Sequence, residues 1–127
     1  MPPILDQSSA LGGGRLVLVD EYSGPVNDAS SAGRAIEAMG DAPLALLAGH
    51  GVFVLGGSAR AVHQRAVALE QRCRNAWHVE AVGGGTPLVG PMAELFARGD
   101  GNGFIGFWES MVRAELAADP TLLDSAR

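Results

Sequence analysis

The chain contains no lysine, and all nine of its basic residues are arginine. Schiff-base catalysis, the anchoring of pyridoxal phosphate and the Walker A phosphate loop each need a lysine amine. The sequence therefore excludes these three kinds of site. Carbanion or enolate chemistry on this chain would need a metal ion or an organic cofactor as its electron sink.

Cysteine is almost as scarce, because the 127 residues include only Cys73. A single cysteine cannot form an internal disulfide and is typical of proteins in a reducing compartment, so we expect a cytoplasmic protein. Cys73 lies within a helical pattern, which favours a small core residue over a nucleophile.

Long apolar runs and an excess of positive charge are also lacking. No apolar stretch approaches the roughly 20 residues that a membrane-spanning helix needs, and no basic segment opens the chain. The net charge of −5 argues against nucleic acid or an anionic membrane surface as the main partner. A hydrophobic fraction of 47% in a chain of this length indicates one ordinary globular domain.

Hydrophobic periodicity, read between glycine and proline breakers, predicts strands that alternate with helices. The predicted strands are 15–19, 44–47 and 52–55, and the predicted helices are 28–39, 59–81, 91–97 and a last one that Asn102 caps and Asp119-Pro120 ends. Asn27 or Asp28 is expected to cap the first helix, and Ser58 the second. The pattern favours an α/β layered domain with a small, largely antiparallel sheet of about three strands covered by helices.

Two of these helices have a predicted apolar face. On helix 59–81 the apolar positions step by four and three residues, and they are Val62, Ala66, Leu69, Cys73 and Ala76 or Trp77. On the last helix they are Phe104, Phe107, Trp108, Met111, Val112 and Leu116. Left exposed, the second set would form a larger apolar patch than monomers tolerate, so we expect a homo-oligomer or a partner at or near this face.

A histidine between two glycines is the most informative local feature. Two short apolar runs flank Gly49-His50-Gly51, and glycine permits the sharp reversal that joins two strands. His50 is therefore predicted at the tip of a hairpin, where a strand end holds the imidazole rigidly. A solvent-exposed turn histidine is the alternative interpretation.

The two remaining histidines do not form a metal motif by themselves. His63 and His78 are fifteen residues apart on one predicted helix, about 22 Å at a rise of 1.5 Å per residue, so they cannot bind one ion together. Each is interpreted as a solvated or interface histidine. The chain has no cysteine pair and no His-x₃-His, so it offers no local zinc motif.

The stretch around His50 closely resembles the second half of the class II aldolase/adducin domain. The resemblance is carried by Gly49-His50-Gly51, by Gly56 at the end of the second strand, and by the Leu69-Glu70 pair in "PLALLAGHGVFVLGGSARAVHQRAVALEQRCRNAW". The flanks "LVLVDEYSGPVNDASSAGRAIEAMGD" and "GFWESMVRAELAADPTLLD" are similar to the family's strand, turn and helix and to its closing helix. The resemblance covers roughly residues 3 to 124.

The resemblance implies a metal-dependent reaction. In such enzymes three histidines hold a divalent ion, usually zinc. Two of them come from a His-x-His segment and the third from the His-Gly turn of the hairpin. By this match His50 would be the third ligand. The ion chelates a hydroxy-carbonyl or hydroxy-acid substrate and stabilises the enolate left when a C–C bond breaks. Aldol cleavage, decarboxylation and epimerisation all occur on this scaffold. The resemblance further implies a ring of four subunits with active sites between neighbours.

The chain also departs from the family pattern. It lacks the His-x-His pair, the "GNxS" substrate loop and the acid/base glutamate of the domain's first half. We therefore expect residues 1–127 to be a single partial domain, the C-terminal half, which alone is inactive as a lyase. A non-catalytic, adducin-like structural or oligomerisation module is the alternative.

Overall fold

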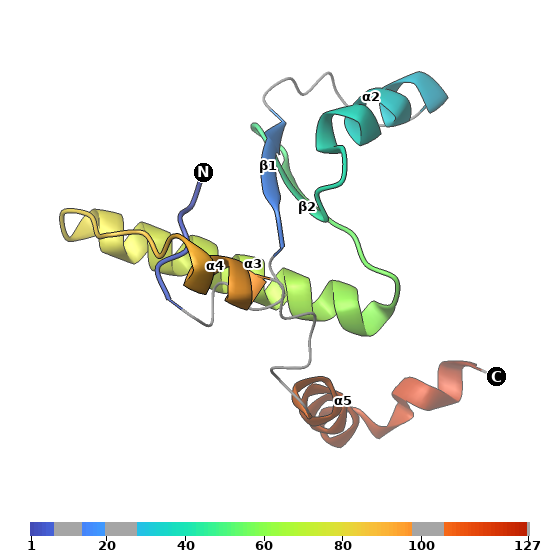
Figure 1. Ribbon diagram of the computed structural model, residues 1–127. Helices are drawn as coiled ribbons and strands as arrows, with labels where there is room; N and C mark the ends of the chain where they lie inside the picture. The colour runs from blue at the N-terminus through green and yellow to red at the C-terminus, as the bar shows by residue number, and fades with distance from the viewer. Residues whose placement is uncertain (7–13, 20–27, 98–105, 127) are drawn as a thin grey trace.

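The computed structural model describes residues 1–6, 14–19, 28–97 and 106–126 (Figure 1). In chain order the elements are β1 (Leu16–Val19), α2 (Ala29–Met39), β2 (Leu44–Leu47), β3 (Gly51–Val54), α3 (Ala59–Ala81), α4 (Pro91–Ala97), α5 (Phe107–Ala118) and the 3₁₀ helix η2 (Pro120–Ala126). The predicted small α/β domain is confirmed. No helix in these described ranges is both long and apolar enough to span a membrane.

The three strands form one sheet in the order β1-β2-β3. β2 and β3 pair antiparallel as the predicted hairpin, with Leu47 opposite Gly51. β1 and β2 pair parallel, with Leu16 opposite Leu44. The sheet is therefore mixed rather than largely antiparallel. The reason is that α2 connects β1 to β2 and returns the chain to the end of the sheet where β1 begins, so that the two strands run in the same direction.

The first helix begins at a capping box. The Ser31 amide donates to Asp28 Oδ1 at 2.7 Å, and the Asp28 amide donates to Ser31 Oγ at 3.4 Å. Of the two predicted caps, Asp28 is therefore the one used. The hydrogen bonds from Ser31 hold the pKa of the Asp28 carboxyl below its ordinary value.

β2 places apolar side chains on both faces of the sheet, since successive residues of a strand point to opposite sides. On one face Leu44 packs with Leu16 of β1 and Leu69 of α3. On the other face Ala45 and Leu47 pack with Met39, the last residue of α2. The sheet is thus a central layer between α3 and the end of α2.

α3 reaches the sheet through a tight turn. Ser58 accepts a hydrogen bond from the Ala61 amide at 3.2 Å and caps the helix as predicted. A Cβ atom on Gly56 would lie 3.0 Å from the Val62 amide nitrogen, so glycine permits this close approach of β3 to the helix.

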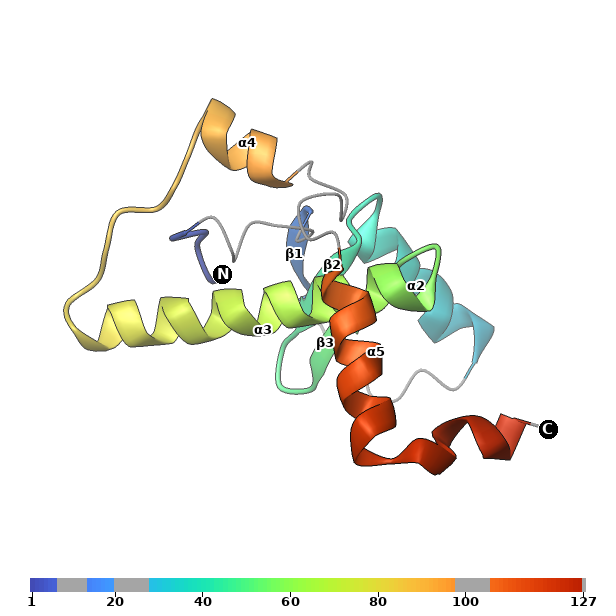
Figure 2. The ribbon, with the colours of Figure 1, turned by 90° about the horizontal axis from the view of Figure 1, so that it is seen from below.

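The predicted apolar face of α3 is only partly correct. Leu69 is buried and Cys73 packs against the same core, but Ala66 is exposed and the side chain of Trp77 is 71% exposed. The reason is length, because a helix of 23 residues spans about 35 Å whereas the strands have four residues each. The helix extends well beyond the sheet (Figure 2), and its C-terminal turns lack the sheet beneath them.

The first residues of the chain lie along α3 and accept a hydrogen bond from a buried arginine of that helix. Arg72 Nε donates to the Pro2 carbonyl at 2.8 Å, and Asn75 Nδ2 donates to the Asp6 carboxylate. The Leu88 amide donates to the Ile4 carbonyl at 2.7 Å. Burial lowers the pKa of Arg72. Side-chain and backbone bonds therefore fix this irregular segment.

The start of α5 differs from the prediction. The helix begins at Phe107 with Gly106 at the N-cap position in a left-handed conformation (φ 86°), without a side-chain cap. Asn102 is therefore not its cap, because a cap directly precedes the first helical residue. Asn102 and Phe104 lie outside the described residues. The other five apolar residues of this face are each half-buried, and α5 ends before Asp119-Pro120 as predicted.

We predict that Leu44→Ala lowers the free energy of unfolding by about 2–5 kcal/mol, because it leaves a cavity between the sheet and α3. Leu44 is 0% exposed, whereas Ile36 on α2 is 69% exposed and serves as the control. Ile36→Ala should change stability by less than about 0.5 kcal/mol. Urea denaturation measures both, and equal midpoints for the two variants would contradict the assigned core.

Cys73 should react slowly with alkylating reagents in the folded protein. Burial raises the pKa of its thiol, with a further contribution from Glu70, so less thiolate is present at any pH below that pKa. The comparison is made at about pH 8, because an unperturbed cysteine thiol has its pKa near this value. At this pH we expect iodoacetamide to modify Cys73 more slowly in buffer than in about 8 M urea, which unfolds the protein. Equal rates in the two solvents would show that Cys73 is not held in the core.

Candidate functional site

His50 lies at the tip of the β2–β3 hairpin, as predicted. β2 ends at Leu47 and β3 begins at Gly51, so Ala48, Gly49 and His50 form the turn between them. The His50 amide donates to the Leu47 carbonyl at 3.0 Å, which closes the turn. The imidazole is exposed. A short hairpin therefore presents this side chain to the surroundings.

The two neighbours of His50 have distinct roles. Gly49 has φ +70°, a backbone conformation that side-chain-bearing residues rarely adopt, and no atom lies within 4 Å of the position of its missing Cβ. Gly51 is paired with Leu47 as the first residue of β3. The turn therefore depends on glycine for its conformation, and it leaves space beside the imidazole.

A hydrogen bond ties this turn to β1. The Ala48 amide donates to the Val19 carbonyl at 3.1 Å, which extends the parallel pairing of β1 and β2 by one residue. The tip that carries His50 therefore lies beside the carboxyl end of β1. The acidic residues that follow β1 in the sequence, Asp20 and Glu21, lie outside the described residues.

The other two histidines are separated from each other along α3, as predicted. His78 is exposed, and its ring meets that of Trp77 edge to face at a centroid distance of 5.6 Å. His63 is half-buried between α3 and α5, with its ring 5.3 Å from that of Trp108 and 6.1 Å from that of Phe107. Of the two, His63 is thus the interface histidine.

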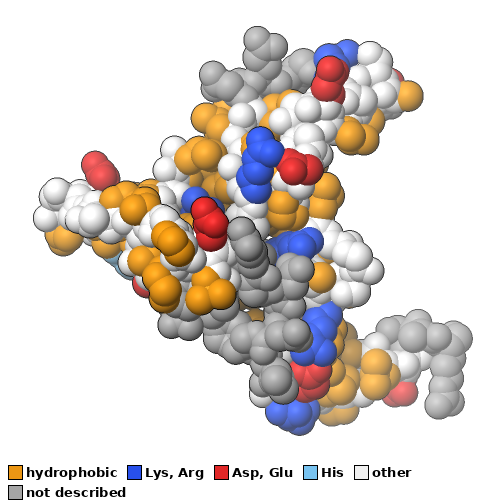
Figure 3. Space-filling model, in the orientation of Figure 1, with side chains coloured by type: hydrophobic (Ala, Val, Ile, Leu, Met, Phe, Trp, Pro, Cys, Tyr) orange, Lys and Arg blue, Asp and Glu red, His pale blue; other side chains and the backbone are white. Residues whose placement is uncertain are grey.

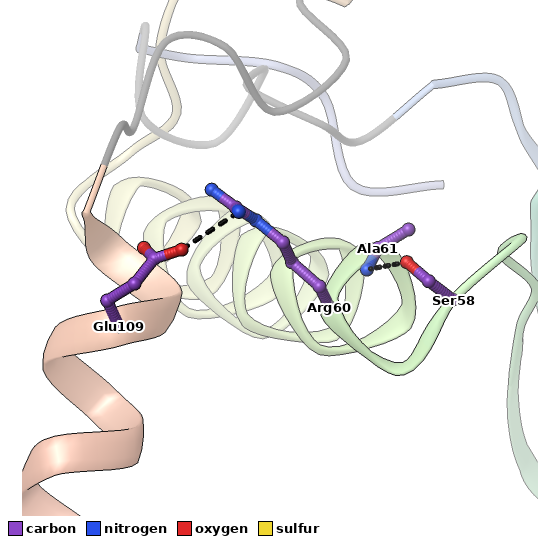
Figure 4. A network of polar contacts seen from close by, with 4 residues as sticks. All are labelled: Ser58, Arg60, Ala61 and Glu109. Atoms are coloured by element: carbon purple, nitrogen blue, oxygen red, sulfur yellow. Dashed lines mark hydrogen bonds and ion pairs between the residues drawn. The ribbon is translucent and has the colours of Figure 1, made fainter.

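A small polar junction joins α3 to α5 close to His63. Arg60 Nη1 donates to Glu109 Oε1 at 2.9 Å, and Arg60 is the second residue of α3 after the Ser58 cap (Figure 4). Three buried polar atoms have no hydrogen-bond partner among the described residues: His63 Nε2, Gln64 Nε2 and Glu109 Oε2. Each such atom costs about 1–3 kcal/mol. α5 is therefore held by contacts that are partly polar and incompletely paired.

The fit of the residues around His50 to a metal ion depends on how many ligands lie near it. A closed zinc site needs three or four ligands within about 2.0–2.3 Å of the ion. In the described part of the chain, no group of three or more His, Cys, Asp and Glu side chains lies close enough together to hold a metal ion. His50 alone supplies one imidazole. The described residues therefore do not by themselves make a complete metal site.

Sequence reasoning missed two features of α3 that only the tertiary structure shows. Arg72 is buried although arginine on a long helix is normally solvated, because the segment from Pro2 to Asp6 covers it. The ion pair of Arg60 with Glu109 joins residues 49 positions apart. The burial of Arg72 had a weak signal in the sequence. Arg72 follows Leu69 by three residues, so the two side chains lie on the same face of the helix.

The chain matches the sequence model of a known protein family. A search of curated proteins and a search of solved structures each found nothing similar. The sequence model described as "Class II Aldolase and Adducin N-terminal domain" matches residues 1–77. This stretch contains the whole sheet, the His50 hairpin and most of α3, and it ends before α4 and α5. Because the match covers more than half of the chain, the protein belongs to the class II aldolase and adducin family.

Proposed function

We propose that this chain supplies His50 as one ligand of a divalent metal, most suitably zinc, in a class II aldolase-like lyase that breaks a C–C bond. The observation that carries the proposal is the exposed imidazole at a glycine-flanked hairpin tip inside the region that matches the family. A neutral imidazole is a common ligand for zinc, and a rigid turn fixes its direction.

The absence of lysine supports a metal as the electron sink. An aldol or decarboxylation reaction leaves an enolate, which either a lysine Schiff base or a Lewis acid must stabilise. This chain contains no lysine. The substrate class that suits such a site is a small hydroxy-carbonyl or hydroxy-acid molecule whose two oxygens chelate the ion.

The remaining ligands and the proton-transferring group must come from outside the described residues. We propose that they belong to the first half of the same domain, so that residues 1–127 act as its C-terminal half. The complete protein is then a cytoplasmic homo-oligomer, a tetramer by resemblance to the family. In that protein His50 contributes its imidazole as one ligand of the metal.

A non-catalytic, adducin-like interaction module is the second candidate. The observation that favours it is the amount of apolar surface exposed at the end of α3 and on α4. A module of this kind would use these helices for association, and its His50 would be a turn residue. The metal content of the complete protein distinguishes the two candidates.

In the longer protein that carries both halves of the domain, His50→Ala should lose most of its bound zinc, because a three-histidine site cannot hold the ion with two ligands. His78→Ala is the matched control, since His78 is also exposed but lies on α3. Elemental analysis after dialysis measures zinc per chain. Equal zinc content in His50→Ala and the unmodified protein would contradict the proposed ligand.

The 127-residue chain alone should be inactive as a lyase. With added zinc and a panel of hydroxy acids and sugar phosphates, we expect no turnover above that of the free metal ion. The physical reason is that one imidazole neither closes a metal site nor transfers the substrate proton. Zinc-dependent cleavage that disappears in His50→Ala would refute this prediction and would show that the chain completes a site by itself.

A further inference from the structure

We propose that α5 and η2 form a hinged arm, which docks on the first turns of α3 and swings away from them while the sheet and α3 stay folded. The arm comprises residues 107–126, and its hinge is Gly106. The short attachment of the arm, the polar partners that it lacks there and the backbone at its start all point to this motion. The motion is independent of the role proposed for His50.

The arm is attached to α3 through the first turn of α5. The rings of Phe107 and Trp108 lie 6.1 Å and 5.3 Å from the His63 ring. The next residue, Glu109, pairs with Arg60. Figure 1 shows α5 and η2 below α3, whereas the sheet lies above it. The described ring and polar contacts between the arm and α3 therefore concentrate at one end of α5.

Polar groups at this attachment lack partners while the arm is docked. His63 Nε2, Gln64 Nε2 and Glu109 Oε2 are buried without a hydrogen bond to any described residue. Water solvates such atoms once the arm opens, so opening removes a penalty that docking imposes. The docked arm is therefore less stable than fully apolar packing at the same place would make it.

The ion pair between Arg60 and Glu109 offsets little of this penalty. The two side chains are 42% and 44% exposed. In the space-filling view, side chains of both charge signs lie at the surface over α5 (Figure 3). Ion pairs that water reaches are screened and contribute little to stability. Docking therefore depends mainly on the ring contacts of Phe107 and Trp108.

Gly106 provides a hinge at the start of the arm. Its φ is +86°, and no side-chain hydrogen bond caps α5 there. No described atom lies within 4 Å of the position of its missing Cβ, so the backbone has room to turn. Glycine adopts positive and negative φ about equally readily, and a change at this one residue redirects the whole helix. By contrast, α2 and α3 begin at the side-chain caps Asp28 and Ser58.

η2 moves with α5 because hydrogen bonds join the two helices. The Asp119 amide donates to the Glu115 carbonyl at 2.8 Å. The Asp119 carboxylate accepts from the Thr121 amide at 3.0 Å and from the Thr121 hydroxyl at 2.6 Å. These bonds lie at the end of α5 that is far from the hinge, so opening at Gly106 leaves them intact.

Hydrogen exchange of the 127-residue chain, followed by mass spectrometry, tests the arm. An undocked helix of 12 residues frays in water, so we expect α5 amides to exchange at least about tenfold faster than those around Leu69. His63→Phe keeps a ring at this place but removes the unpaired nitrogen, and it should slow α5 exchange about fivefold. His78→Phe, on the exposed end of α3, is the matched control and should leave α5 unchanged. Gly106→Ala should speed α5 exchange, because alanine is strained at φ +86° and opening relieves this strain.

Several outcomes would overturn the hinged arm. These are α5 amides that exchange as slowly as the core of α3, a His63→Phe variant that leaves α5 exchange unchanged, and a His78→Phe control that slows it equally. Unchanged exchange in Gly106→Ala would exclude this glycine as the hinge. Circular dichroism checks folding, and if His63→Phe loses helix, His63→Leu replaces it with the same expected slowing. His50→Ala should leave α5 exchange unchanged, so failure here and failure of the metal-site proposal are distinguishable.

Discussion

The rest of this structure depends on the burial of β2 on both faces. Leu44 and Ala45 are neighbours in the chain, they point to opposite sides of the sheet, and both are fully buried. This requires α3 on one face and the end of α2 on the other, with β1 and β3 on either side. The burial of β2 also fixes the position of His50, because the hairpin turn that contains His50 begins directly after Leu47, the last residue of β2.

Local signals predicted most of the elements because their causes are local. Asp28 and Ser58 cap their helices through hydrogen bonds three residues ahead, and glycines mark the hairpin and the end of α3. Chain-distant contacts were beyond such reasoning. Which turns of α3 lie over the sheet depends on the length of strands elsewhere in the chain, and this is why Trp77 is exposed although its spacing suggested a core position.

The candidate site shows the same division. The tip position and accessibility of His50 follow from glycine conformations within three residues, so the sequence was sufficient to predict them. The interface role of His63 was not predictable, because Phe107 and Trp108 reach it from a helix more than 40 positions away. A metal site is the extreme case, since its ligands converge only when distant segments fold together. In the proposed function His50 is one such ligand, and the other ligands belong to other segments.

Two surfaces of the chain thus have different physical demands. At the His50 tip the exposed group is a polar imidazole, which water solvates well. At the end of α3 and on α4 the exposed groups are apolar side chains, which water solvates poorly. Both lie at the margins of one small sheet and its longest helix, because a layer of three four-residue strands cannot cover 23 residues of α3. The overhang of α3 beyond the sheet is what leaves the apolar side chains at its C-terminal end exposed.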